Sequence, residues 1–256
     1  MWDRASVVIT GASGGIGAAL ARQLGSRARR LILVARDEQR LRAVADGLAC
    51  ETRVISCDLA QAEARDDLRR TLAGETVDVL VNNAGIGAWG RFAELEEARL
   101  RELLAVNVTA PIELTRWLLP AMLSRGRGAI LNVGSVNGFQ GTPFMAAYGG
   151  TKGLLANFTE GLGWELRGTG VIAVLLAPGS TRTDFFASGG VPIEGMLKFM
   201  GEPEAVARAG IRALDRRRPC AIPGLLNWLA VASQRFVPRW LVGRVAYRLL
   251  RPPPAP

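Results

Sequence analysis

The sequence predicts a single α/β domain in which a doubly wound parallel sheet carries helices on both faces. Short apolar segments of strand length alternate with helical patterns along most of the chain, which is the order of an α/β fold. These segments are nearly continuous rather than alternating with polar residues, as expected for parallel strands buried on both faces. A chain of 256 residues with 49% apolar residues is also large enough to form one such core.

The predicted elements follow one another in a regular order. Strands are expected at residues 6–10 (SVVIT), 31–35 (LILVA), 52–56 (TRVIS), 77–82 (VDVLVN), 129–133 (AILNV) and 171–177 (VIAVLLA). Helical patterns lie between them at Ile16–Leu24, Asp37–Leu48, Gln61–Leu72, Ala98–Leu123 and Gly153–Leu166. Because strands and helices take turns, the strands are expected to run parallel, with ligands at their carboxyl ends.

A glycine-rich turn follows the first predicted strand. The segment TGASGGIG places Gly11, Gly15 and Gly17 in the spacing G-x-x-x-G-x-G, directly before a helical pattern. Glycines allow close backbone approach, and the free N–H groups and dipole of a helix N-terminus favour an anion. The turn lacks the lysine of a nucleoside triphosphatase loop, so it predicts a site for the phosphates of a dinucleotide.

The end of the second predicted strand bears on the choice of dinucleotide. An acidic residue there often binds the adenosine ribose of NAD, whereas this chain has Ala35 followed by Arg36. An arginine in this place favours a 2′-phosphate, so NADP(H) is preferred and NAD(H) stays open. Asp37 follows immediately, and Arg36 could instead pair with it or with solvent.

The residues available for proton transfer are few, because the chain has no histidine. This excludes a Ser-His-Asp triad, a histidine-based metal site and a histidine general base, and no metal site is expected. Only two of the 32 basic residues are lysines, and Lys152 lies four positions after Tyr148, one of only two tyrosines. On a helix the two would share a face, and a neighbouring ammonium is expected to lower the pKa of the phenol toward neutral pH. Tyr148 is therefore a candidate general acid/base, and Lys152 suits the position because it is a compact charge.

Seven motifs resemble those of the short-chain dehydrogenase/reductase family. They are TGASGGIG at 10–17, CDL at 57–59, NNAG at 82–85, VNV at 106–108, GS at 134–135, YGGTK at 148–152 and PGSTRT at 178–183. They occur in the family's order, and the resemblance spans roughly residues 5–223. It implies a Rossmann-type sheet of about seven strands. It also implies an NAD(P)-dependent oxidoreductase that interconverts a ketone and a secondary alcohol.

The resemblance also implies the site residues. The catalytic residues would be Asn107, Ser135, Tyr148 and Lys152, with Ser135 on the substrate carbonyl, Tyr148 as proton donor and Asn107 holding a water next to Lys152. The cofactor would be bound by Gly11, Ser13, Gly14, Gly15, Ile16, Gly17, Arg36, Asp58, Leu59, Asn83, Ala84, Gly85, Asn107, Tyr148, Lys152, Pro178, Gly179 and Thr183. Within this set Asp58 would contact the adenine, and Pro178, Gly179 and Thr183 the nicotinamide end. The family commonly has YxASK where this chain has YGGTK, a variation that does not touch the tyrosine or the lysine.

The C-terminal part of the chain has a different pattern. We expect a catalytic, NAD(P)-binding domain at residues 1–224 and an amphipathic helical extension at 225–256 that ends in PPPAP. Leu241, Val245 and Leu249 would lie on one helix face and Arg244, Arg248 and Arg251 on another. This pattern fits a membrane surface, and it also fits docking on a partner subunit or capping of an apolar substrate pocket. The longest uncharged stretch is too short to span a bilayer.

The remaining expectations concern substrate, partners and location. Aromatic residues and methionines flank the expected cleft and suggest an apolar ketone, alcohol or acyl compound; they are Phe139, Phe144, Met145, Phe185, Phe186, Met196, Leu197, Phe199 and Met200. Residues 185–201 are expected to form either a mobile loop over the cleft or an ordinary surface loop. Family analogy implies a homodimer or homotetramer built on the helices at Ala98–Leu123 and Gly153–Leu166.

Three widely spaced cysteines and an N-terminus unlike a secretory signal predict a cytoplasmic protein, with peripheral membrane contact as the variant that the tail suggests. The net charge of +9 raises a nucleic-acid module as an alternative. The arginines are scattered and no nucleic-acid motif is present, so no nucleic-acid partner is expected. A second alternative is a catalytically silent cofactor-binding scaffold or redox sensor, against which the intact Ser135, Tyr148 and Lys152 argue.

Overall fold

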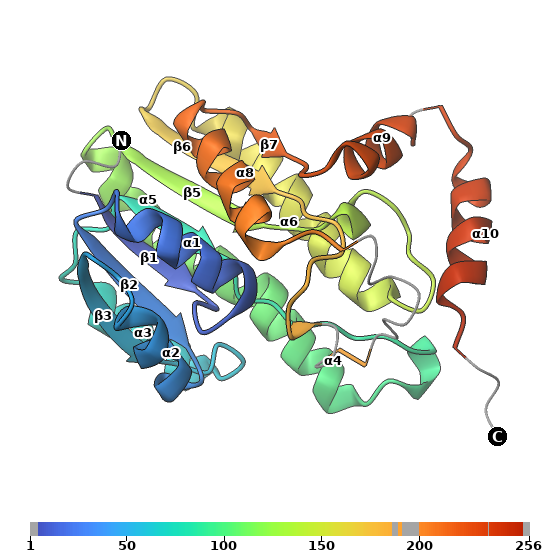
Figure 1. Cartoon of the computed structure of the whole chain (residues 1–256), viewed down its shortest axis with the longest axis horizontal. Helices are drawn as coiled ribbons and strands as arrows, with labels where there is room; N and C mark the ends of the chain where they lie inside the picture. The colour runs from blue at the N-terminus through green and yellow to red at the C-terminus, as the bar shows by residue number, and fades with distance from the viewer. Residues whose placement is uncertain (1–4, 186–188, 191–199, 235, 253–256) are drawn as a thin grey trace.

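The computed structural model describes residues 5–185, 189–190, 200–234 and 236–252 (Figure 1). Its seven strands form one sheet in the order β3-β2-β1-β4-β5-β6-β7, and every neighbouring pair is parallel. The chain starts in the middle of the sheet, builds outward to β3, and then returns to continue from β4 on the other side of β1. This reversal is the doubly wound topology, so the predicted fold class is confirmed.

The six predicted strands are present with small shifts at their ends. The strands are β1 (Ser6–Thr10), β2 (Arg30–Ala35), β3 (Glu51–Ser56), β4 (Val79–Asn82), β5 (Gly128–Val133), β6 (Val171–Leu176) and β7 (Cys220–Ala221). Strand β7 was not among the predicted strands; it has only two residues and pairs with Leu175 and Leu176 of β6. A strand this short carries no apolar pattern of its own and forms because β6 offers it an edge.

The helices of the described residues follow the predicted alternation. They are α1 (Gly15–Gly25), α2 (Glu38–Ala45), α3 (Ala62–Leu72), α4 (Glu97–Leu104), α5 (Ala110–Ser124), α6 (Ala146–Glu165), α8 (Pro203–Asp215), α9 (Leu225–Ser233) and α10 (Arg239–Leu250). The single helix expected at Ala98–Leu123 is divided into α4 and α5 by a π-helical turn at Ala105–Thr109. The sequence analysis also missed α8, although Pro203 at its first turn and the apolar spacing of Val206, Ile211 and Leu214 were signals for it.

The apolar core consists of one cluster on each face of the sheet. Helices α1, α2 and α8 cover one face and α3, α4, α5 and α6 the other, and α1 and α8 lie side by side (Figure 1). Within β1, Val7 and Ile9 belong to the first cluster and Val8 to the second. Because both faces are covered, each side chain of the strand must be apolar or have a hydrogen-bond partner. This explains the continuous apolar runs in the sequence.

The C-terminal helices stand apart from these layers. Helix α9 has no buried residue, and α9 and α10 lie at one end of the molecule (Figure 1). No helix in the described part of the chain is long and apolar enough to cross a membrane. The boundary predicted at residue 224 stays a prediction. Of the loop expected at 185–201, residues 186–188 and 191–199 lie outside the described residues.

Candidate active site

The glycine turn between β1 and α1 forms the floor of the candidate site. Gly11 and Gly15 have φ angles of 64° and 53°, values that favour glycine, and α1 begins at Gly15. No side chain caps this N-terminus, and its first turn holds no acidic residue. The free N–H groups of α1 therefore remain available for an anion, and these residues fit the phosphates of a dinucleotide.

The segment after β4 fixes the shape of this turn. The Asn83 side chain donates from Nδ2 to the carbonyl oxygens of Thr10, at 2.9 Å, and Gly11, at 3.1 Å. The Thr10 hydroxyl in turn accepts the backbone N–H groups of Asn83 and Ala84, both at 3.0 Å. The NNAG motif and the glycine turn are thus one hydrogen-bonded unit, although they lie about 70 residues apart in sequence.

Replacing Gly17 with alanine should disturb this unit. A Cβ atom there would lie 2.2 Å from the Gly11 carbonyl oxygen and 2.5 Å from Asn83 Nδ2, so the turn would have to move. We expect the free energy of unfolding to fall by about 1–3 kcal/mol, as for other overpacked sites, and NADPH binding to weaken with it. Urea unfolding and a fluorescence titration measure both. Gly74→Ala is the control, because a Cβ at Gly74 meets nothing within 4 Å, and equal effects of the two variants would contradict the prediction.

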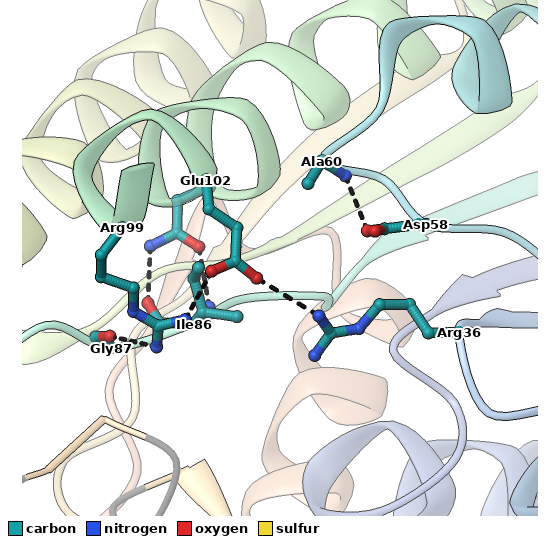
Figure 2. A network of polar contacts seen from close by, with 8 residues as sticks. Arg36, Asp58, Ala60, Ile86, Gly87, Arg99 and Glu102 are labelled. Carbon is teal, nitrogen blue, oxygen red and sulfur yellow. Dashed lines mark hydrogen bonds and ion pairs between the residues drawn. The ribbon is translucent and has the colours of Figure 1, made fainter. Parts of the chain in front are cut away.

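Arg36 directly follows β2, at the predicted adenosine end, and two partners were considered for it, Asp37 and solvent. Its Nη1 atom donates to Oε1 of Glu102 at 3.2 Å (Figure 2), and its side chain is 61% exposed. Asp37 does not pair with it and instead caps α2 by accepting the N–H of Arg40 at 2.9 Å. The alternative in which Arg36 pairs with Asp37 is therefore wrong. Arg36 pairs instead with Glu102 of α4, and no pattern in the sequence indicated that these two residues meet.

The predicted adenine contact, Asp58, lies close by. Asp58, after β3, accepts the N–H of Ala60 at 3.0 Å, which holds its carboxylate at the carboxyl edge of the sheet (Figure 2). Leu59 beside it is 5% exposed and packs into the core, with Ile86 in the same cluster. Asp58 thus lies at the same carboxyl edge of the sheet as Arg36.

Arg40 is a candidate that sequence reasoning missed. Its Nη2 atom lies 2.9 Å from where a Cβ of Gly14 would be, directly beside the glycine turn, and donates to Asp184 at 2.7 Å. Together with Ser13 and Arg22 it lines a cavity of about 270 Å³ between α1 and α2. In the sequence, only the position of Arg40 four residues after Arg36 pointed to this role. The contact of Arg40 with the glycine turn depends on how α2 packs, which the sequence does not show.

Tyr148 and Lys152 project from the first turns of α6 into the protein. They are 6% and 4% exposed, and Lys152 Nζ lies 5.9 Å from the centre of the Tyr148 ring. The Lys152 ammonium donates to the Val133 carbonyl at the end of β5 at 2.8 Å. The side chain of Ser135, which follows the same strand, lies close enough to the Tyr148 hydroxyl to act on its pKa. The fold therefore brings Ser135, Tyr148 and Lys152 into one buried group.

The expectation that Lys152 lowers the pKa of Tyr148 is wrong. Burial raises the pKa of Tyr148 to about 12, and the Ser135 side chain offsets only part of this effect. Burial likewise lowers the pKa of Lys152 to about 8. The ammonium is directed at the Val133 carbonyl rather than at the phenol, so desolvation decides the protonation of both groups.

Lys152 should make the stability of the fold depend on pH. Its pKa falls from 10.5 to about 8 on folding, so between these values the unfolded chain binds more protons. The free energy of unfolding should therefore rise with pH across this window. In Lys152→Met the titrating group is gone. We expect the stability difference between the two proteins to shift by about 2 kcal/mol in favour of the wild type from about pH 7 to pH 10.

Urea unfolding at a series of pH values checks this shift. Tyr148 and Cys57 have raised pKa values, about 12 and about 11, so they weaken the fold as pH rises through their windows, but they do so in both proteins. A difference that stays constant with pH would show that burial does not lower the pKa of Lys152.

Asn107 lies in the π-helical turn between α4 and α5 and is 1% exposed. Its side chain accepts the N–H of Ile86 at 2.9 Å and donates to the Ile86 carbonyl at 3.0 Å and to Thr151 Oγ1 at 3.2 Å. A Cβ at Gly85 would lie 3.3 Å from Lys152 Nζ and 3.4 Å from Asn107 Oδ1, so the absent side chain leaves space beside both. Asn107 thus ties the strand-end segment to α6, and its water-holding role stays a prediction.

The residues predicted for the nicotinamide end follow β6. The Pro178 carbonyl accepts the N–H of Val136 at 3.0 Å, which joins this segment to the Ser135 turn. The Thr183 methyl group lies 2.8 Å from where a Cβ of Gly15 would be. The segment therefore runs from the Ser135 turn to the glycine turn.

Apolar side chains lie near Tyr148 in space or in sequence. The Phe185 ring is 5.3 Å from the Tyr148 ring. Phe144 and Ala146 line a cavity of about 410 Å³ together with the segment at residues 90–95. Four of the residues expected to flank the cleft lie outside the described residues, namely Phe186, Met196, Leu197 and Phe199. In the described part of the chain, no group of three or more metal-ligating side chains could hold a metal ion.

Comparisons with known proteins show which proteins this chain is similar to. The sequence profile described as short chain dehydrogenase matches residues 5–190. The very-long-chain 3-oxoacyl-CoA reductase of Bos taurus is 30% identical over 254 residues, which cover 96% of this chain and 79% of that protein.

Two solved structures are also similar. The short-chain dehydrogenase from Sphingobium yanoikuyae in complex with NADPH has a TM-score of 0.83 at 30% identity, covering 98% of each chain. The bulky-bulky ketone specific alcohol dehydrogenase from Comamonas testosteroni has a TM-score of 0.78 at 29% identity, covering 90% of this chain and 92% of that one.

Proposed function

Because the chain belongs to the short-chain dehydrogenase family, we propose that it is an NADP(H)-dependent oxidoreductase that interconverts an apolar ketone or acyl-type carbonyl compound and its secondary alcohol. The observation that carries this proposal is the buried group of Ser135, Tyr148 and Lys152 at the carboxyl edge of the sheet. The open N-terminus of α1 lies at the same edge, where ligands bind in such sheets.

Each member of the buried group has a part in the proposed reaction. When bound, the nicotinamide cofactor supplies the hydride. The Ser135 hydroxyl donates a hydrogen bond to the substrate carbonyl oxygen and so holds it beside Tyr148. With a pKa of about 12, Tyr148 is protonated at neutral pH and donates its proton to that oxygen as the alcohol forms. Lys152, held by Val133, places a positive charge near the resulting phenolate.

The protonation of Tyr148 bears on the direction of reaction. A phenol with a raised pKa is in its protonated form at neutral pH, which is the form that carbonyl reduction needs, whereas alcohol oxidation needs a phenolate as base. Reduction of the carbonyl is thus the proposed direction near neutral pH. A preference for NADPH agrees with it.

Two arginines support the preference for NADP(H) over NAD(H). Arg36 stands at the adenosine end, and Arg40 lies beside the glycine turn, so both can offer guanidinium donors to a 2′-phosphate. Both already have carboxylate partners, Glu102 and Asp184. These pairs are exposed and therefore weak, so a phosphate can compete with them. The Sphingobium structure is a complex with NADPH.

A fluorescence titration with NADPH and NADH tests the proposed cofactor. Arg36→Ala should weaken NADPH binding by about tenfold or more, the cost of losing a charged hydrogen bond to phosphate, and should leave NADH binding nearly unchanged. Glu102→Gln is the matched control, because it removes the partner of Arg36 and keeps the arginine; its NADPH affinity should not fall. Equal binding of NADPH and NADH would overturn the NADP preference. Binding of neither would contradict the proposed function and favour the silent scaffold.

The proposed apolar substrate is supported by the side chains around Tyr148 and by two relatives. Phe185 packs on Tyr148, and Phe144 lines the adjoining cavity. The Bos taurus protein is named for a very-long-chain 3-oxoacyl-CoA and the Comamonas enzyme for bulky ketones. A series of ketones and 3-oxoacyl thioesters of increasing apolar size should show rising kcat/KM, and best turnover of the smallest ketone would contradict this substrate class.

A homodimer or homotetramer and a cytoplasmic location also remain part of the proposal. Exposed apolar residues on the helices expected to pair support an oligomer, and they are Leu104, Leu123, Leu154 and Trp164. Analytical ultracentrifugation of the purified protein separates monomer, dimer and tetramer.

A further inference from the structure

A large apolar surface lies on the two C-terminal helices and the segment between them, here named the α9–α10 face. Its exposed members are Leu225, Leu226, Trp228, Leu229, Phe236, Trp240, Leu241 and Val245. Phe236 is 87%, Leu225 72% and Trp240 67% exposed. So many exposed large apolar side chains within one short part of the chain are uncommon in a protein surrounded only by water, and they indicate a site where a membrane or another molecule binds.

The charge around this face has a single sign. After Asp215 the sequence contains no acidic residue. Arg239, Arg244, Arg248 and Arg251 are exposed on or beside α10. None of these four takes part in the ion pairs found among the described residues, although Arg251 lies over the Tyr247 ring at 5.8 Å. The face therefore combines tryptophan, phenylalanine and leucine with arginine alone.

The face is joined to the rest of the molecule by contacts with Trp89 and Phe144. Trp89 Nε1 donates to the Leu250 carbonyl at 3.1 Å, and the Tyr247 ring lies 5.2 Å from the ring of Phe144. Phe144 also lines the cavity of about 410 Å³. Whatever binds the α9–α10 face thus lies next to the proposed substrate cavity.

We infer that the α9–α10 face docks on a membrane surface that carries anionic lipids. Helices of 9 and 12 residues are too short to span a bilayer, but they can lie in the interface with tryptophans and leucines among the acyl chains. Tryptophan and tyrosine favour this depth, and each arginine near the surface attracts the anionic headgroups. A second copy of the chain is a poorer occupant, because a two-fold contact through this face would bring arginines against arginines.

Vesicle sedimentation of the whole protein tests this inference. We expect binding to vesicles of phosphatidylcholine with phosphatidylserine, and weaker binding to phosphatidylcholine alone or at high salt. Arg239→Gln combined with Arg244→Gln should weaken binding to the anionic vesicles by about 30-fold, from about 1 kcal/mol for each arginine. Trp228→Ser combined with Trp240→Ser should weaken binding to both kinds of vesicle.

A matched control has two other exposed arginines replaced, in Arg216→Gln combined with Arg218→Gln. They lie between α8 and β7, at the amino end of β7, whereas α9 follows the carboxyl end. This control should bind anionic vesicles like the wild type. NADPH binding should be the same in all these variants, which shows that they fold.

Three results would overturn the inference. They are no sedimentation with either kind of vesicle, equal binding to both, and an equal loss in the control and in the Arg239 and Arg244 variant. Self-association that disappears in the Trp228 and Trp240 variant, without vesicle binding, would instead assign the face to contacts between copies of the chain.

Discussion

Replacing Tyr148 with phenylalanine should reduce kcat for ketone reduction by about 10²–10⁴-fold, the usual contribution of a positioned general acid. Phenylalanine keeps the ring that packs against Phe185, so the site should retain its shape. What is lost is the hydroxyl group, together with its interaction with Ser135. NADPH affinity should change little, because the phosphates are assigned to the glycine turn. Steady-state kinetics combined with a fluorescence titration separate the two quantities.

The other tyrosine of the chain provides a matched control. Tyr247 lies on α10, where its ring packs near that of Phe144. Tyr247→Phe removes the same hydroxyl group from a ring in a similar contact. It should keep nearly wild-type kcat. If Tyr148→Phe kept wild-type kcat as well, another residue would have to donate the proton.

Replacing Lys152 with arginine should also remove most activity, by about 100-fold or more, because a reacting group displaced by about 1 Å can cost that much. Lys152 is 4% exposed, and its ammonium donates to the Val133 carbonyl. On another side it lies close to Gly85, where even a Cβ atom would be in tight contact with it. A guanidinium keeps the charge but is planar and wider, so it does not fit a place shaped for one compact nitrogen. It also cannot lose its proton, whereas burial lowers the pKa of Lys152 to about 8.

Lys152→Met completes this comparison, since methionine is an unbranched side chain one atom shorter than lysine and carries no charge. If charge alone were needed, the arginine variant would exceed the methionine variant by a large factor in kcat. We expect both to be similarly inactive. Wild-type kcat in Lys152→Arg would contradict the shape argument and would leave the preference for lysine among so many arginines unexplained. NADPH titration of both variants shows whether the cofactor site is intact.

The fold could be predicted from the sequence because its signals are local. Six of the seven strands and the glycine turn can be recognised from apolar runs and residue type. The parallel direction of the strands follows from their alternation with helices. The two-residue β7 could not be found in this way, because it forms only where β6 offers an edge. The π-helical turn at Ala105–Thr109 also went unpredicted, since its residues read as an uninterrupted helix.

The candidate site, like the fold, could be predicted from the sequence only in part. The sequence by itself determined which residue types were available: without histidine, Tyr148 and Lys152 were the pair fit for proton transfer, and their spacing on a helix set them on one face. Only the tertiary structure decided their protonation, because burial and the aim of the ammonium at Val133 outweigh the attraction expected from spacing. It likewise decided that Glu102 meets Arg36, 66 residues away in sequence. Such contacts depend on how separate helices and strands pack, and no local pattern of residues predicts which side chains from distant parts of the chain will meet.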